Sequence, residues 1–94
     1  MFSYVENIAL GKQTFQSSDY TSLNAEKTTG PSSNAVDGNT NQDFFQGKSC
    51  THTKKDTNAW WIVDLEDFYE ISSVKIYNRG DGAGTLCKES KYVN

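Results

Sequence analysis

The chain has 94 residues, enough for one small domain with a thin core, since only 35% of its residues are hydrophobic and 13% are aromatic. Its 9 basic and 12 acidic residues give a net charge of −3, and the lysines are scattered rather than clustered. This balance disfavours nucleic acid and anionic membrane surfaces as main partners. No apolar run reaches the roughly eighteen residues that a membrane-inserted helix needs.

The first third of the chain carries weak signals. Residues 1–6 lack the charged start and apolar stretch of a secretory signal peptide, and we interpret them as an N-terminal extension. Thr14–Ser18 alternates weakly with β-favouring residues, which predicts a short edge strand. Residues 17–33 are rich in Ser, Thr, Asn and Gly, so we expect a loop, with a helical turn around Leu23–Lys27.

A long polar segment follows at residues 34–52. It contains many oxygen donors, a cysteine and the only histidine of the chain, and it has no apolar periodicity apart from Phe44–Phe45. Neither a helix nor a regular strand is therefore predicted here. A loop of this length and polarity is typical of a binding segment, although a solvated loop is the competing interpretation.

The clearest strand signal is Trp60–Leu65, whose alternation places Trp61, Val63 and Leu65 on one face and Trp60, Ile62 and Asp64 on the other. A second strand is predicted over Glu70–Tyr77. Repeats, heptads and long helices are absent from the sequence, so the predicted class is all-β, with short strands and long loops.

Catalysis is disfavoured, because a single histidine without a recognisable nucleophile or metal-ligand spacing leaves little for an active site. Residues 37–48 begin like a calcium-binding EF-hand loop, but Gln42 and Lys48 stand where that loop requires glycine and glutamate. Calcium held in another geometry and a solvated polar loop both remain open. His52 and Arg79 offer donors suited to sugar hydroxyls, while Arg79–Asp81 also spells an integrin-binding tripeptide that recurs by chance.

Four segments of the chain stand in a recognisable order: Ser33–Asn39 (SNAVDGN), Ser49–His52 (SCTH), Ala59–Leu65 (AWWIVDL) and Ile71–Asp81 (ISSVKIYNRGD). Together they resemble the F-type lectins, the fucose-binding fucolectins, which share the discoidin-like fold of coagulation-factor C-type domains. The resemblance covers residues 7–81, and Ala59 stands where the family has proline. Twenty-six residues separate His52 from Arg79, as in the sugar-binding motif of that family.

The resemblance implies a β-jelly-roll sandwich that binds L-fucose or fucosylated glycans with structural Ca²⁺, in a secreted protein. A homo-oligomer is a further expectation from the same resemblance. It implies that His52, Arg79 and Asp81 form the sugar site, with Phe45 near an aromatic that packs on the sugar. It also implies that calcium receives oxygens from Asn34, Asp37, Asn39 and Ser49, and that its cage is completed near Cys87 and Glu89. The cation would hold the loop that presents His52.

The chain departs from the family pattern after Asp81, so we expect an incomplete sandwich and a divergent tail at residues 82–94. Leu86 stands where the family has a second basic sugar contact, which predicts weakened affinity. Thr85–Glu89 resembles the last strand of the family, which implies a Cys50–Cys87 disulfide and a lost block of strands; the alternative is an unrelated tail. Besides a fucose lectin, a discoidin-like adhesion module for a protein or another glycan and a non-functional fragment remain open.

Overall fold

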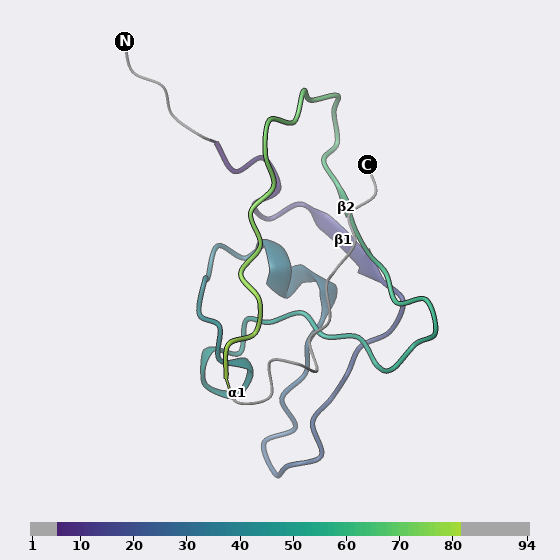
Figure 1. Ribbon diagram of the computed structural model, residues 1–94, viewed down its shortest axis with the longest axis vertical. Coiled ribbons are helices and arrows are strands. Elements are labelled where there is room, and N and C mark those ends of the chain that lie inside the picture. Colours follow the sequence, from purple (N-terminus) through teal and green to yellow (C-terminus); the bar gives the residue numbers. More distant parts are fainter. Residues whose placement is uncertain (1–5, 82–94) are drawn as a thin grey trace.

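The computed structural model describes residues 6–81, and two short antiparallel strands form its only sheet within that range (Figure 1). Strand β1 spans Gln13–Gln16 and β2 spans Trp61–Asp64, with Gln13 opposite Asp64 and Gln16 opposite Trp61. The predicted strand at Trp60–Leu65 is confirmed as β2. The edge strand expected at Thr14–Ser18 is present but begins and ends earlier in the chain.

The two faces of this sheet differ, as the alternation in β2 predicted. Trp61 is buried and Val63 is half-buried on one face, whereas Ile62 and its partner Phe15 are exposed on the other. The Trp61 indole Nε1 donates a hydrogen bond of 2.9 Å to the Ser32 carbonyl oxygen. The inner face of the sheet is thereby joined to the segment that begins the polar loop.

Two short helices lie in the part of the chain that was predicted to be irregular. The 3-10 helix η1 spans Ser32–Val36, and the α-helix α1 spans Phe44–Gly47. The Asp43 carboxylate caps α1 by accepting hydrogen bonds from the backbone N–H groups of Phe45 and Gln46. The prediction of a loop without helix was wrong here, because capping stabilises a helical turn too short to show periodicity.

In residues 21–29 the chain reverses direction, an arrangement termed here the turn-back, rather than forming the expected helical turn. Thr21 and Thr29 make an isolated antiparallel bridge, and the Ser22 N–H donates to the Thr28 carbonyl. These pairings bring the two ends of the segment together, which uses the backbone groups that a helix would have bonded along the chain.

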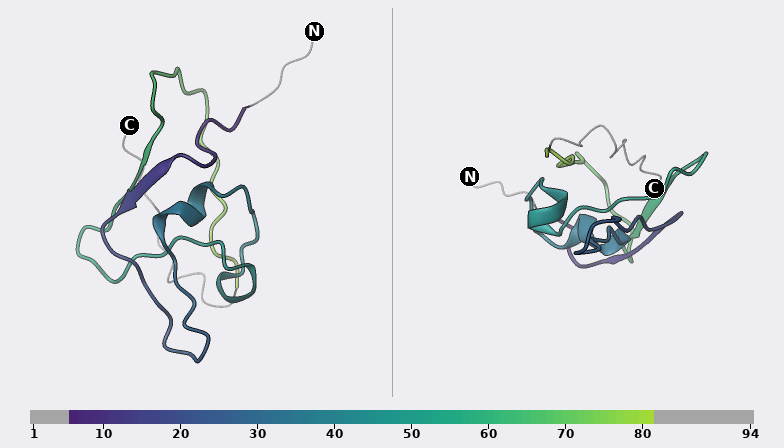
Figure 2. Two further views of the ribbon diagram at one scale, coloured as in Figure 1. Left: turned by 180° about the vertical axis from the view of Figure 1, so that it is seen from behind. Right: turned by 90° about the horizontal axis from the view of Figure 1, so that it is seen from below.

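The predicted strand at Glu70–Tyr77 is absent: these residues are extended but unpaired among the described residues. In Figure 1 this segment passes in front of η1, and the right-hand view of Figure 2 shows it standing away from the layer that holds β1 and η1. Its residues favour extended backbone, but a strand also needs a neighbouring strand with which to form hydrogen bonds. No helix within residues 6–81 is long and apolar enough to cross a membrane.

Candidate sugar-binding site

The backbone of His52 is held by two segments that are distant in the sequence. The His52 N–H donates to the Gly30 carbonyl at 2.9 Å, and the Tyr20 N–H donates to the His52 carbonyl at 2.8 Å. Gly30 in turn donates to the Tyr20 carbonyl. A Cβ atom at residue 30 would lie 2.6 Å from the backbone nitrogen of His52, so this close approach requires glycine.

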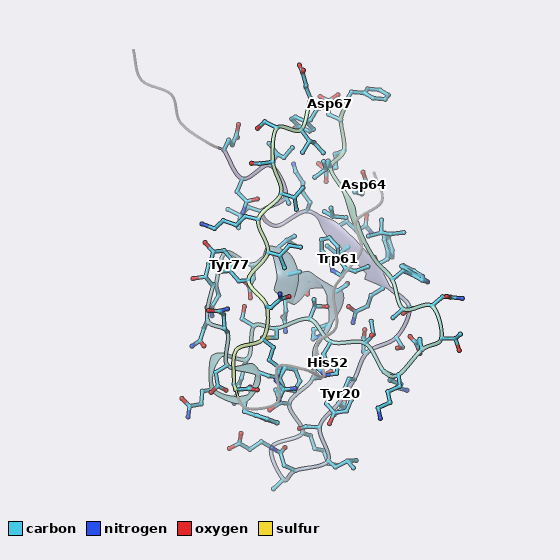
Figure 3. The ribbon with its side chains drawn as sticks, in the orientation of Figure 1. Tyr20, His52, Trp61, Asp64, Asp67 and Tyr77 are labelled. Carbon is cyan, nitrogen blue, oxygen red and sulfur yellow. The ribbon has the colours of Figure 1, made fainter. Side chains whose placement is uncertain are left out.

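Aromatic rings fix the orientation of the His52 imidazole. It stacks on Tyr20, with ring centroids 4.3 Å apart and planes inclined at 28°, and its centroid lies 5.3 Å from that of Phe44. Figure 3 shows Tyr20 and His52 side by side. Phe44 is fully buried and also contacts Tyr20 and Phe45, so this one ring joins three segments of the chain.

The hydrogen bonding of His52 leaves one ring nitrogen available. Nδ1 lies 2.6 Å from the Thr53 carbonyl oxygen, and this contact requires the proton to sit on Nδ1. Burial lowers the pKa of His52, the positive charge of Arg79 lowers it further, and the bond to Thr53 opposes both effects. The net lowering of the pKa favours the neutral form of the ring. Its buried Nε2 has no partner among the described residues, and in this tautomer it is a hydrogen-bond acceptor.

Arg79 reaches the same aromatic cluster from the other side. Its guanidinium carbon lies 4.7 Å from the Phe44 ring centroid and 5.1 Å from that of Phe45. Arg79 Nε donates to Asp81 Oδ1 at 2.7 Å, and Asp81 Oδ2 accepts from the Phe44 N–H at 2.9 Å. Asp81 thus orients Arg79 and ties it to α1. The terminal NH₂ groups of Arg79 make no hydrogen bond with any described residue.

Of the four sugar-site residues expected from the sequence, His52 and Arg79 line one open hollow of about 830 Å³, whereas Phe45 and Asp81 are not among its lining residues. Its lining includes Tyr20, His52 and Thr53 together with Tyr77, Asn78 and Arg79. Phe44 and Tyr20 were missed in the sequence. The only signal was the isolated Phe44–Phe45 pair in a polar segment, and Phe45 rather than Phe44 was selected from it.

The pairing of Arg79 with Asp81 also bears on the integrin-binding tripeptide. The Arg79 residue is only 6% exposed, and its carboxylate partner lies two positions further along the same tripeptide. Arg79 and Asp81 are bonded to each other, so the tripeptide does not present them as two separate charged groups. Arg79 and Asp81 of this tripeptide are therefore used within the candidate site, in keeping with the expectation that the tripeptide occurs here by chance.

Three of the residues expected to serve calcium lie close together. Ser49 Oγ donates to Asp37 Oδ2 at 2.5 Å and lies 3.4 Å from the Asn39 carbonyl oxygen. Asp37 Oδ1 accepts from the Asn39 N–H at 2.8 Å. The Asn34 side chain instead donates its amide to the Cys50 carbonyl.

The remaining metal and disulfide predictions, which involve Cys87 and Glu89, lie outside the described residues. Between residues 6 and 81, no group of three or more His, Cys, Asp or Glu side chains is placed to hold a metal. Oxygens at this site would therefore come from one carboxylate together with neutral groups, a donor set that calcium accepts.

Comparison with known proteins identifies the family. Residues 34–92 match the F5/F8 type C family of NedA-like, galactose-binding domains. Fucolectin from Anguilla anguilla is 43% identical over 79 residues, which cover 84% of this chain and 48% of that protein. Fucolectin-6 from Anguilla japonica is 56% identical over 52 residues, which cover 55% of this chain and 27% of that protein.

A solved structure agrees with these relatives. A His 62 mutant of the lectin binding domain of Lectinolysin, complexed with Lewis b, has a TM-score of 0.69 at 46% identity. The match covers 84% of this chain and 50% of that one. The chain thus spans about half the length of the fucolectin and of the solved domain.

These matches confirm the predicted all-β, discoidin-like fold class, and a lectin-type family confirms the prediction of a non-enzymatic protein. The domain boundaries predicted at residues 7–81 and 82–94 stay predictions. Sequence, fold and relatives agree: the chain belongs to the F5/F8 type C family of NedA-like, galactose-binding domains, on its F-type lectin branch.

Proposed function

We propose that the chain binds L-fucose, free or as part of a fucosylated glycan, in the hollow between His52 and Arg79. The observation that carries this proposal is that His52 and Arg79 both line the hollow and that each has polar groups without a partner among the described residues. The Nε2 lone pair of His52 accepts from a sugar hydroxyl, and the terminal N–H groups of Arg79 donate to sugar oxygens. Two relatives are fucolectins, and the solved neighbour is complexed with Lewis b.

The affinity is expected to be weak. Leu86 stands where the resemblance to the family calls for a second basic sugar contact, so two polar residues carry the recognition. A neutral hydrogen bond contributes about 0.5–1.5 kcal/mol and a charge-assisted one about 1.5–3 kcal/mol, which leaves the dissociation constant of a monosaccharide in the millimolar range or above it. Display of several sites on one assembly would raise the apparent affinity for a glycan surface.

Calorimetric titration with L-fucose tests the proposal, and D-fucose is the matched control because its composition is the same and only its handedness differs. His52→Phe keeps an aromatic ring against Tyr20 but removes the Nε2 acceptor. We expect it to lower affinity for L-fucose about tenfold or more, equivalent to about 1.4 kcal/mol. Equal binding of the two enantiomers, or full affinity in a folded His52→Phe protein, would contradict the assignment.

Calcium is part of the proposal as a structural ion. The residues present fit it, because the Asp37 carboxylate, the Asn39 carbonyl and the Ser49 hydroxyl converge within hydrogen-bonding distance of one another. Ser49 lies three residues before His52, so a cation held here would restrain the segment that presents the imidazole. Its role is preorganisation of the sugar site.

A thermal melt with calcium or with chelator tests this part separately. A ligand that binds only the native state at 100 times its dissociation constant adds about 2.7 kcal/mol to stability. Asp37→Asn should abolish that calcium-dependent stabilisation, whereas Asp67→Asn, at an exposed carboxylate that accepts from the Phe68 N–H, should retain it. A calcium effect that survives Asp37→Asn would place the ion elsewhere.

An extracellular location belongs to the same proposal. Fucosylated glycans are displayed on cell surfaces and secreted proteins, so a protein that recognises them works outside the cell. Detection of the native protein in the secreted fraction of its source cells would support this location, and its retention in the cytosol would contradict it.

A further inference from the structure

The extended segment at residues 70–77, termed here the open strand, has backbone groups with no partner. None of its N–H or C=O groups bonds to a described residue, and the side-chain contact recorded within it is that of Lys75 with Tyr77. A row of free donors and acceptors on an extended backbone is a template for pairing with another strand.

The open strand is also apolar enough to gain from being covered. Val74, Ile76 and Tyr77 are 57%, 47% and 50% exposed. No proline or glycine interrupts the chain between Leu65 and Asn78. Natural edge strands are usually protected by such breaks or by projecting charges.

The one lysine of the open strand does not provide that protection. The Lys75 ammonium lies 5.3 Å from the centroid of the Tyr77 ring on the same segment, and this contact draws its charge back against its own strand. Glu70 lies at the far end of the segment, so the centre of the strand is left without a projecting charge.

The C-terminal end of the open strand is already anchored, which lowers the entropy lost on pairing. The Asn78 carbonyl accepts from the Gln42 side chain at 2.8 Å, and the Gly80 N–H donates to the Gln42 backbone carbonyl at 2.7 Å. Arg79 is buried between these two contacts. Figure 2 shows that the segment itself stands clear of the β1–η1 layer.

We propose that the open strand pairs antiparallel with the open strand of a second copy of this chain, with Val74 facing Val74 across a two-fold axis. A symmetric antiparallel pair must place one residue opposite itself at its centre. Centring on Val74 puts Ile71 opposite Tyr77, a β-branched and aromatic pairing of the kind that stabilises sheets, and Ser72 opposite Ile76.

The charges of the segment favour the same arrangement. With Val74 at the centre, Lys75 faces Ser73 and Glu70 faces Asn78, so no two like charges lie directly opposite each other. The segment is therefore compatible with itself on both faces, which argues for a second copy over an unrelated strand. This inference does not rest on the proposed sugar binding, although pairing would fix the segment that leads into Arg79.

Sedimentation velocity of the full chain across micromolar to submillimolar concentrations tests the proposal. We expect a monomer–dimer equilibrium that Val74→Glu weakens at least about tenfold, since it sets two carboxylates face to face. Leu23→Glu is the matched control: the same charge is added at an apolar residue that is 98% exposed and far from the open strand in sequence. It should leave the dimer intact.

A mixing experiment tests the register and protects against a simple folding defect. Val74→Glu and Val74→Lys proteins should each be monomeric alone, and their equimolar mixture should form heterodimers, because the two opposed charges then attract. A wild-type monomer at every concentration would overturn the proposal. So would equal effects of Val74→Glu and Leu23→Glu, or a mixture that stays monomeric.

Discussion

Phe44 is the residue on which the candidate site is built. It is fully buried, and its ring lies within 6.0 Å, centroid to centroid, of Tyr20, Phe45 and His52, with the Arg79 guanidinium at 4.7 Å. The Phe44 N–H is bonded to the same carboxylate that orients Arg79. One side chain thus fixes both polar groups of the hollow.

The lowered pKa of His52 makes stability depend on pH. Its unfolded-state pKa is about 6.5, so below that pH the unfolded chain binds a proton that the folded chain resists. Stability is therefore complete above pH of about 6.5 and falls on acidification, by at most about 1.4 kcal/mol per pH unit for one proton. Thermal melts between neutral pH and mildly acidic pH measure this slope.

His52→Phe is the control for that slope, because it removes the titrating group and keeps the ring. We expect a flatter profile in this range. The other group with a lowered pKa, Asp56, is held as a carboxylate by the Ser18 and Ser17 hydroxyls and titrates at more acidic pH. An unchanged slope in His52→Phe would show that another group controls the acid sensitivity.

Gly30 is the second residue at which a small change should have a large effect. A Cβ there would lie 2.6 Å from both N and Cβ of His52 and 3.0 Å from the Cys50 carbonyl oxygen, all on backbone or on a fixed side chain. Gly30→Ala should cost about 1–3 kcal/mol and displace the imidazole from the hollow. Denaturant unfolding and L-fucose titration measure the two effects.

Gly80→Ala is the matched control for Gly30→Ala. Its Cβ would meet only the Gln42 side chain, at 3.2 Å, which has room to move. We expect a much smaller change in stability. If Gly30→Ala were as mild as Gly80→Ala, the close packing of residue 30 against His52 would not be what positions the imidazole.

At the scale of elements, the sheet and η1 are connected through Trp61 and Thr14. Trp61 Nε1 donates to the Ser32 carbonyl, and Thr14 Oγ1 donates to Ser32 Oγ at 2.8 Å. Ser32 begins η1, which leads into the polar loop. The short sheet therefore supports the loop that carries the candidate site.

The adjacent tryptophans provide a matched test of that connection. Trp61→Phe leaves the half-buried Ser32 carbonyl without its donor and should cost about 1–3 kcal/mol. Trp60→Phe alters a side chain on the outer face, where the residue is 44% exposed, and should change stability by less than about 0.5 kcal/mol. Chemical unfolding compares the two, and equal losses would show that the Trp61 indole bond is not the important contact.

Elements could be predicted from the sequence where buried and exposed side chains alternate along a strand. The alternation of β2 identified both its position and its inner face, because Trp61 packs inward and Ile62 does not. The pattern at Glu70–Tyr77 indicated a strand equally well, but a pattern reports propensity and cannot supply a bonding partner. Helix α1 spans four residues, too few to show a helical period.

The site residues were predicted from family motifs and not from the alternation of side chains. His52 and Arg79 were recognisable through motifs and spacing that resemble a known family. The contacts of Tyr20 and Phe44 with His52 join segments distant in the sequence, and no local pattern encodes them. Asp81, whose carboxylate orients Arg79, was expected at the site. Its hydrogen bond with the Phe44 N–H could not be predicted, because it depends on the folded arrangement of two distant segments.

At the scale of the whole molecule, the described residues form a small core. Val36, Phe44 and Trp61 are the hydrophobic residues that are buried among them, and the chain spans about half the length of its fucolectin relative from Anguilla anguilla. Such a core supports only marginal stability. Binding of calcium, a sugar or a second copy should therefore produce a measurable increase in the melting temperature.

Amide chemical shifts of the labelled protein, recorded as L-fucose is added, test the central claim most directly. We predict saturable shifts at Phe45, His52 and Arg79, with the turn-back at residues 21–29 unchanged and with no response to D-fucose. Shifts that are absent, centred away from the hollow, or identical for the two enantiomers would contradict the assignment of this hollow as a fucose site.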